Sequence, residues 1–277
     1  MTRVVAVAKN TFREAVRDRV LYLVAAFGLL VLASGKIIGW VSVGEDIVVV
    51  RNVGLSAISF FGAMIALFVG TGLIQRELGG RTIYTILARP VARWEFVLGK
   101  YIGLLGTVLV SAAAMSVVFL VYLAIVTAVA PGDAIAGADV PPALGLPVFQ
   151  SLFLTACELT VVTALAVFFS SISTPILSAV FTFFAYVAGQ FASDIAMFAD
   201  MMGPQSGAEG TSSVGAFVLM VVYRVLPNLD VMNIRSVAIH GMAVSGAQVF
   251  WTFLYAVTYG GFVIALTCAL FERRNLP

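Results

Sequence analysis

Six long apolar stretches, separated by short polar segments, dominate the pattern of hydrophobic and polar positions along the chain. Each is close to the ~20 apolar residues that a helix needs to cross roughly 30 Å of hydrocarbon. The pattern therefore predicts six membrane-spanning helices, over Val20–Val43, Val53–Ile74, Tyr101–Ala130, Val148–Phe169, Pro175–Ser193 and Val249–Leu270. We expect the fifth of these to continue toward Phe198, with an interruption at Asp194.

A seventh apolar stretch, Val214–Leu226, is shorter, contains Arg224 and stops at Pro227. Apolar runs of about a dozen residues are more typical of re-entrant or interfacial segments than of full spans. A full crossing at this place would put the C-terminus on the opposite side of the membrane from the N-terminus.

The basic residues favour six spans. If the N-terminus is inside, twelve of the sixteen Lys and Arg residues lie on the inner side, and the others are Lys36, Arg51, Arg224 and Arg235. The positive-inside rule takes such an excess as the mark of the cytoplasmic face. We therefore predict a multi-pass protein of the cell (inner) membrane with both termini in the cytoplasm.

Two charged segments lie on the predicted inner side. Residues 1–19 carry apolar side chains on one helical face, which is typical of an amphipathic helix lying along the membrane surface. Residues 75–100 form the large inner loop of the six-span domain, 20–277. The other inner connection, Ser170–Thr174, is a tight turn in which Thr174 and Pro175 suit the N-cap and first position of the next helix.

The outer side is predicted to carry two connections. The Pro131–Pro147 segment, rich in Pro, Gly and Ala, has the composition of a loop. Residues 199–247 form a long insertion before the last span, and this insertion is too apolar to be a plain solvated loop.

Composition excludes several classes of protein. Of the 277 residues, 61% are hydrophobic and 11% charged, whereas soluble domains have about 45–50% and about 25%. The net charge of +2 is too small to indicate a partner nucleic acid. Cys157 and Cys268 lie in apolar runs without CxxC spacing, and His240 is the single histidine. We therefore predict that the chain has no catalytic residue, no metal site and no bound cofactor. The GxxxxGK[ST] phosphate loop is absent, so the chain cannot hydrolyse ATP by that route.

Glu158 is the one ionisable residue near the middle of a predicted span. A charge there costs about 3 kcal/mol or more, so the carboxyl group must face protein or water, or be protonated. It either marks a polar point on a substrate or proton pathway, or forms a neutral hydrogen bond to a neighbouring helix. On the third span, Gly99, Gly103 and Gly106 offer a small-residue face for helix packing, with no indication of the partner.

The inner loop at 75–100 is the most informative segment. Glu77 and Arg81 are spaced for an ion pair on a short helix, and Arg89-Pro90 interrupts that helix. A compact helix, break and helix between two spans is suited to contact with a soluble partner. The charged and rigid residues proposed for this contact are Glu77, Arg81, Arg89, Pro90, Arg93, Glu95 and Lys100.

This loop resembles the first inner loop of type-2 ABC exporter permeases. The segment that begins at Lys9 and contains Phe12, Arg13, Glu14 and Arg17 more narrowly resembles the permeases labelled for multi-copper enzyme maturation. The resemblance covers the whole chain in layout. It implies an all-α integral membrane protein with six transmembrane helices, an N-terminal interface helix and re-entrant outer helices before the last span.

The resemblance also implies partners. The chain would pair with a second permease copy or a paralogue, and with two ATP-binding cassette subunits that carry ATP and Mg. Residues 75–100 would be the coupling helix that docks on the ATPase, with Phe12, Arg13, Glu14 and Arg17 on the interface helix beside it. Membrane lipid and an outer-side accessory protein complete the expected partners.

The cargo is not set by the resemblance. The apolar spans favour export or flipping of a hydrophobic or amphiphilic substrate, and no Met, Cys or His ladder suits bare copper ions. The alternative is ATP-driven mechanical signalling to an outer-side partner without export. A secondary transporter would usually show an internal repeat or several ionisable residues in its spans. A membrane enzyme would need clustered carboxylates or histidines, and a structural anchor would lack ATP dependence.

Overall fold

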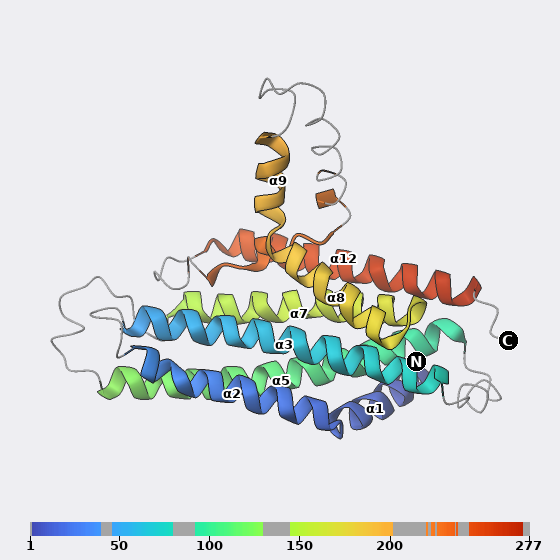
Figure 1. Cartoon of the computed structure of the whole chain (residues 1–277), viewed down its shortest axis with the longest axis horizontal. Helices are drawn as coiled ribbons and strands as arrows, with labels where there is room; N and C mark the ends of the chain where they lie inside the picture. The colour runs from blue at the N-terminus through green and yellow to red at the C-terminus, as the bar shows by residue number, and fades with distance from the viewer. Residues whose placement is uncertain are drawn as a thin grey trace.

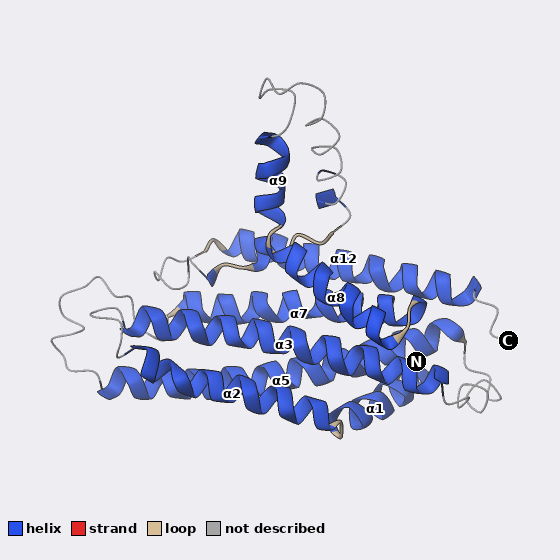
Figure 2. Ribbon diagram, in the orientation of Figure 1, coloured by secondary structure: helices blue, strands red, loops and turns tan. Residues whose placement is uncertain are grey.

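The computed structural model describes residues 2–39, 46–79, 92–129, 145–201, 220, 223–224, 226–235, 237 and 244–273. All regular structure in these ranges is helical, which confirms the predicted all-α class for the described part of the chain (Figure 2). The elements are α1 (Thr2–Val16), α2 (Arg19–Gly39), α3 (Asp46–Gly79), α5 (Arg93–Val129), α7 (Leu146–Ile172), α8 (Pro175–Gln190), α9 (Ala192–Met201), the short 3-10 helix η2 (Asp230–Met232) and α12 (Gly246–Arg273).

The long helices form one bundle with α3 and α7 in its middle (Figure 1). About 72% of the most apolar stretch of α3 and 67% of that of α7 are buried, against 28% for both α5 and α12. The outer helices thus turn large apolar faces away from the protein, as helices surrounded by lipid do. The end of α3, the start of α5, α1 and the end of α12 lie at the same end of the bundle (Figure 1). We call it the inner end.

Glycines bring the two central helices close together. A Cβ atom added to Gly62 of α3 would lie 2.7 Å from a methyl carbon of Leu159 on α7. One added to Gly70 would lie 3.1 Å from the Cβ of Ala166 and 2.9 Å from Leu104 of α5. Because little hydrophobic force acts between helices in lipid, such close packing is a main source of stability there.

Four helices of the described part are long and apolar enough to cross a membrane: α3, α5, α7 and α12. A fifth span results if α8 and α9 are counted together. α2 is a helix of 21 residues, and Arg19–Val31 is the unbroken apolar part of it that the structure describes with side chains. The structure therefore supports four or five spans, and six spans remain a prediction.

The predicted fifth span is broken. α8 has 16 residues, about 24 Å at ~1.5 Å per residue, which is shorter than a bilayer core of roughly 30 Å. The chain then bends by 67° at Phe191, and α9 leaves the side of the bundle (Figure 1). The break lies at Phe191 and not at Asp194, which sits inside α9.

Part of the predicted outer insertion returns to the bundle. In the segment 226–235, Leu229, Met232 and Ile234 are buried, and the backbone N–H of Leu229 donates a 3.0 Å hydrogen bond to the carbonyl oxygen of Gly189 in α8. The segment packs against α7. It therefore re-enters the protein just beyond the end of α8. Most of the apolar run Val214–Leu226 lies outside the described residues.

The predicted tight turn between the fourth and fifth spans is present. Thr174 has the extended backbone of an N-cap residue and Pro175 begins α8, although the Thr174 side chain makes no capping bond. Two serines fasten the turn instead. The Ser178 hydroxyl donates to the carbonyl of Phe169 at 2.9 Å, and the Ser170 hydroxyl donates to the carbonyl of Thr71 on α3 at 3.3 Å.

Candidate functional site

The inner end of the bundle carries the predicted partner-binding loop. α3 runs to Gly79, five residues past the predicted span end at Ile74, and α5 begins at Arg93, eight residues before Tyr101. Two helices thus continue beyond the predicted membrane boundary and frame the loop. Arg81, Arg89 and Pro90 lie outside the described residues, as do the side chains of Glu77 and Arg93. The predicted Glu77–Arg81 pair and the break at Pro90 remain predictions.

Glu95 fixes the point where the chain leaves this loop. Its Oε2 accepts a 3.1 Å hydrogen bond from the backbone N–H of Ala92, the residue just before α5. This is the reach of an N3 glutamate back to the N-cap amide that forms half of a capping box. A negative charge in the first turn also complements the helix dipole. The start of α5 is therefore held firmly.

Lys100 joins the loop side of α5 to the interface helix. Its side chain is only 3% exposed, its Nζ lies 3.8 Å from Oε2 of Glu14 on α1, and it sits 5.8 Å from the centre of the Phe96 ring. Sequence reasoning assigned Lys100 to the loop and Glu14 to the interface helix. The structure brings the two together inside one chain.

The glycine face of α5 is where α1 packs. A Cβ added to Gly103 would lie 2.5 Å from the carbonyl oxygen of Ala8 and 2.7 Å from the Cβ of Thr11. One added to Gly99 would lie 2.7 Å from the Cβ of Val7. These small residues let the α1 backbone approach α5 more closely than any side chain would allow.

The residues that were predicted to belong to the interface helix differ in burial: some face the bundle and others are exposed. Phe12 is half-buried, with its ring 3.5 Å from where a Cβ of Gly106 would lie. Arg13 and Arg17 are exposed. A two-residue turn follows α1, and Asp18 Oδ1 accepts a 2.9 Å hydrogen bond from the N–H of Val20 at the start of α2. α1 therefore contacts α5 on one side and is joined to α2 by this short turn.

A second polar site surrounds Glu158 in the middle of α7. Glu158 is 1% exposed. The Ser59 hydroxyl of α3 donates to its two carboxyl oxygens at 2.9 and 3.1 Å, and the Gln190 side-chain amide of α8 donates to Oε1. The Tyr186 hydroxyl lies 3.4 Å from that of Ser59. We call Glu158, Ser59, Tyr186 and Gln190 the polar cluster.

The polar cluster coincides with the break in the fifth span. Gln190 is the last residue of α8, and Gly189 beside it accepts the hydrogen bond from Leu229 of the returning segment. Four parts of the chain therefore meet here at mid-depth of the bundle. Glu158 thus accepts hydrogen bonds from the two neighbouring helices, and its place on a substrate or proton pathway remains a prediction.

Sequence reasoning did not single out Ser59, Tyr186 or Gln190. The signal that could have found two of them is a row of polar side chains four residues apart in the predicted fifth span, which are Ser178, Thr182, Tyr186 and Gln190. Hydrogen bonds between residues 99 and 32 positions apart cannot be read from spacing.

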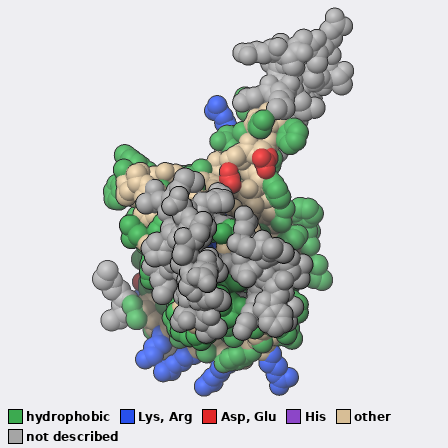
Figure 3. Space-filling view, turned by 90° about the vertical axis from the view of Figure 1, so that its left-hand side faces the viewer, with side chains coloured by type: hydrophobic (Ala, Val, Ile, Leu, Met, Phe, Trp, Pro, Cys, Tyr) green, Lys and Arg blue, Asp and Glu red, His purple; other side chains and the backbone are tan. Residues whose placement is uncertain are grey.

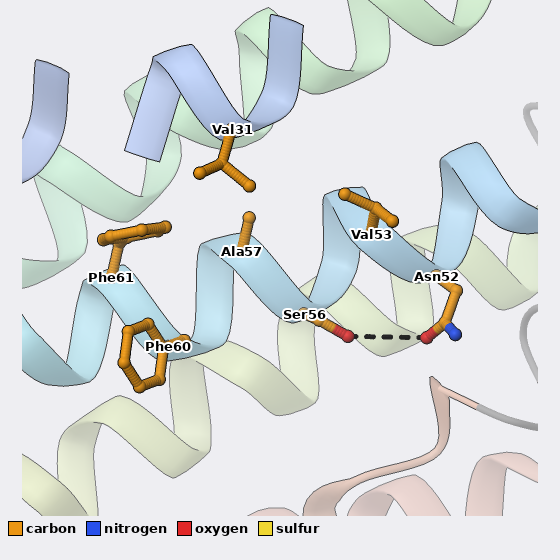
Figure 4. A pocket seen from close by; sticks show the side chains of 7 residues that line it. All are labelled: Val31, Asn52, Val53, Ser56, Ala57, Phe60 and Phe61. Atoms are coloured by element: carbon orange, nitrogen blue, oxygen red, sulfur yellow. Dashed lines mark hydrogen bonds between the residues drawn. The ribbon is translucent and has the colours of Figure 1, made fainter. Parts of the chain in front are cut away.

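A groove of about 330 Å³ opens on the side of the bundle between α2 and α3 (Figure 4). Among the described residues its walls are apolar except at one end, where the Ser56 hydroxyl donates a 3.4 Å hydrogen bond to the side-chain oxygen of Asn52. The lining residues are Val31, Asn52, Val53, Ser56, Ala57, Phe60 and Phe61. An apolar groove with a polar end has the character of a site for an amphiphile.

Metal-binding chemistry finds no support in the described ranges. There, no three His, Cys, Asp or Glu side chains come together in a way that could hold an ion. Cys157 is buried and Cys268 half-buried, both as free thiols, and His240 lies outside these ranges.

Comparison with known proteins identifies the family. No curated protein sequence matches the chain significantly. The family model described as "ABC-2 family transporter protein" matches residues 5–276, nearly the whole chain, from the interface helix to the end of α12. Members of this family are membrane subunits that normally pair with ATP-binding cassette subunits. With its several apolar helices and this full-length match, the chain belongs to the ABC-2 family of transporter permeases.

Proposed function

We propose that this chain is the permease subunit of an ABC exporter and works with two separate ATPase subunits bound at its inner end. The observation that carries the proposal is the construction of that end. α5 starts at the predicted coupling loop, is capped there by Glu95, and is locked to α1 through two glycines and the Lys100–Glu14 pair. A force that the ATPase exerts on the loop would therefore act on α5 and α1 together.

The length of α5 explains how such a push would cross the membrane. The helix has 37 residues without a break, about 55 Å at ~1.5 Å per residue. It packs against α1, α2, α3, α7 and α12. ATP binding would draw the two ATPases together, and α5 would carry this movement to the outer half of the bundle. Such a change requires the ATPases to bind the two permease conformations with different affinity.

The polar cluster supplies a second moving part in this proposal. α8 ends at Gln190, and α9 and the returning segment are separate pieces, so the outer half of the fifth span can shift without bending a continuous helix. Hydrogen bonds from Ser59 and Gln190 to Glu158 would hold α3, α7 and α8 together on the inner side of that joint. The cluster acts here as a fixed point and not as a pathway for protons.

For the cargo, we propose a hydrophobic or amphiphilic molecule. The apolar groove beside Asn52 and Ser56 supports this class of cargo, because it opens to the side of the bundle, where lipid lies. The sequence around residues 9–19 supports a place among the permeases labelled for multi-copper enzyme maturation. Pairing with a second permease copy or a paralogue, and an inner-membrane location with cytoplasmic termini, belong to the same proposal.

Mechanical signalling to an outer-side protein is the second candidate function. The observation that favours it is α9, which projects from the bundle with Met197 and Phe198 about 60% exposed (Figure 1). A partner protein could cover these side chains. Export and signalling differ in outcome: cargo accumulates across the membrane only in export, although both consume ATP.

A double substitution tests the coupling role. We expect Glu77→Gln with Arg93→Gln to insert normally but to lose the ATPase subunits, or to hydrolyse ATP without response to cargo. The matched control is Asp194→Asn, which removes an exposed charge on α9, far from the inner end of the bundle. If the double variant keeps full ATPase binding and cargo-dependent hydrolysis, the coupling assignment is wrong.

A further inference from the structure

The N-terminal helix α1 presents two opposite faces. Ala8, Thr11 and Ala15 are buried against the bundle. Lys9, Arg13 and Arg17 are spaced four residues apart, and all three are exposed. Because side chains four apart stack on one side of a helix, Lys9 and Arg13 lie on the side of α1 away from the protein, and the exposed Arg17 follows in the turn directly after α1. We call these three cations the basic face.

The orientation of the basic face is fixed by packing. The backbone of α1 lies against Gly99 and Gly103 of α5, so the helix cannot roll without a collision. Glu14, the one acidic residue of α1, is turned toward Lys100 and lies 3.8 Å from its Nζ. The Glu14 carboxylate is thus directed toward α5, and Asp18 is the other acidic residue of residues 1–19, next to Arg17 in the turn.

The basic face lies at the level where the lipid-facing surface begins. After the two-residue turn that follows α1, α2 starts at Arg19 and at once exposes large apolar side chains, with Tyr22 at 57% and Leu23 at 71% exposure. An exposed tyrosine at the start of an apolar helix is typical of the membrane–water boundary. Phosphate groups of lipids occupy this boundary.

The direction of the basic face distinguishes lipid from the ATPase. In a view along the length of the bundle, Lys and Arg side chains gather at the lower edge (Figure 3), the edge where α1 lies in Figure 1. Helix α1 itself lies along the lower side of the bundle, near its inner end (Figure 1). The helix ends that frame the coupling loop instead point along the bundle (Figure 1).

From this geometry we infer that Lys9, Arg13 and Arg17 together bind the headgroups of anionic lipids in the leaflet at the inner end of the bundle. The phosphate group of one or two lipids would lie across these cations, with acyl chains beside the exposed start of α2. Such binding would hold α1 at the membrane surface while α5 moves. The inference needs only the α1–α5 contact and does not depend on the proposed function.

The experiment measures lipid binding by the full chain in detergent, by native mass spectrometry with phosphatidylglycerol or phosphatidylcholine as probe. Wild type should bind phosphatidylglycerol at least tenfold more tightly, and raising the salt should weaken this binding. Each cation near a lipid surface contributes about fivefold in affinity, so Lys9→Gln/Arg13→Gln/Arg17→Gln should lose roughly a hundredfold. Lys9→Arg/Arg13→Lys/Arg17→Lys, which keeps the charge, should retain the preference.

Two further arms separate the possible outcomes. Arg224→Gln removes an exposed cation elsewhere on the molecule and should leave lipid binding unchanged. Soluble glycerol phosphate should not compete with the lipid, because it lacks the acyl chains. Equal binding of the two lipids by wild type, or an unchanged preference in the triple glutamine variant, would overturn the inference. So would a triple variant that keeps its lipid preference but loses the ATPase subunits, since the basic face would then bind protein.

Discussion

Replacing Gly103 by alanine is expected to force α1 off α5. The new Cβ would lie 2.5 Å from the carbonyl oxygen of Ala8 and 2.7 Å from the Cβ of Thr11. An ordinary contact begins near 3.4 Å, so the α1 backbone must retreat by about 3.4 − 2.5, or ~0.9 Å. Because one colliding atom belongs to the backbone, no side-chain rotation can relieve the clash.

The cost follows from two opposing effects. Overpacking of a close contact costs about 1–3 kcal/mol, whereas alanine is favoured over glycine inside a helix by up to ~1 kcal/mol. We therefore expect Gly103→Ala to destabilise the protein by about 1–2 kcal/mol. Gly106→Ala is the matched control, because its Cβ would meet the Phe12 ring at an ordinary 3.5 Å. That variant should be neutral or slightly more stable.

Two measurements in detergent report this difference. Thermal denaturation followed by size-exclusion chromatography gives the loss of stability, and limited trypsin digestion gives the accessibility of α1 at its exposed arginines. Gly103→Ala should unfold at a lower temperature and be cut faster near Arg13 and Arg17 than Gly106→Ala. Equal denaturation midpoints and equal cleavage rates in the two variants would refute the packing of α1 on the glycine face.

Three further contrasts test the rest of the structure, each by thermal denaturation in detergent. Glu158→Ala should lower the free energy of unfolding by about 1–3 kcal/mol for each buried donor left without an acceptor. Glu158→Gln keeps an acceptor oxygen and should lower it by less. Equal losses of stability in the two variants would contradict the hydrogen-bonded cluster. Gly189→Ala places a Cβ 2.9 Å from a backbone oxygen of the returning segment and should destabilise by about 1–3 kcal/mol, while Gly261→Ala meets nothing within 4 Å and should be neutral. Glu14→Gln should lower the free energy of unfolding more than Lys100→Met, because it removes a negative charge beside a cation at 3% exposure, whereas Glu14 is 36% exposed and water can solvate it; the opposite order would refute the pairing.

Hydropathy predicted the ends of α7 and α12 well, because both helices end close to the limits of their apolar sequence. The fourth span was predicted to begin at Val148 and the sixth to end at Leu270, and α7 and α12 lie within three residues of both positions. α3 and α5 extend further at the inner end because helical structure continues in polar sequence, and hydropathy carries no signal for that. The break in the predicted fifth span could not be predicted from composition, because the bend between α8 and α9 depends on tertiary contacts.

The contacts at the two sites could be predicted only in part. The spacing of Gly99 and Gly103 indicated a packing face, but nothing in the sequence showed that α1 would occupy it. The energetic cost of a charge inside the membrane indicated that Glu158 has polar neighbours. Ser59 and Gln190 are far from it in the sequence, so they could not be named in advance. The interruption was placed at Asp194 because it is polar. The actual break follows Gln190, where tertiary contacts with the returning segment replace the continuing helix.

The assignment to an ATP-driven permease is tested most directly by purifying the tagged chain from its native membranes in mild detergent and measuring the mass and composition of the complex. We expect a stoichiometric partner with a phosphate-loop ATPase domain and a total mass that contains two permease subunits and two ATPase subunits. A chain that is purified stable and folded, yet free of any ATPase, would contradict the coupling role of the inner end.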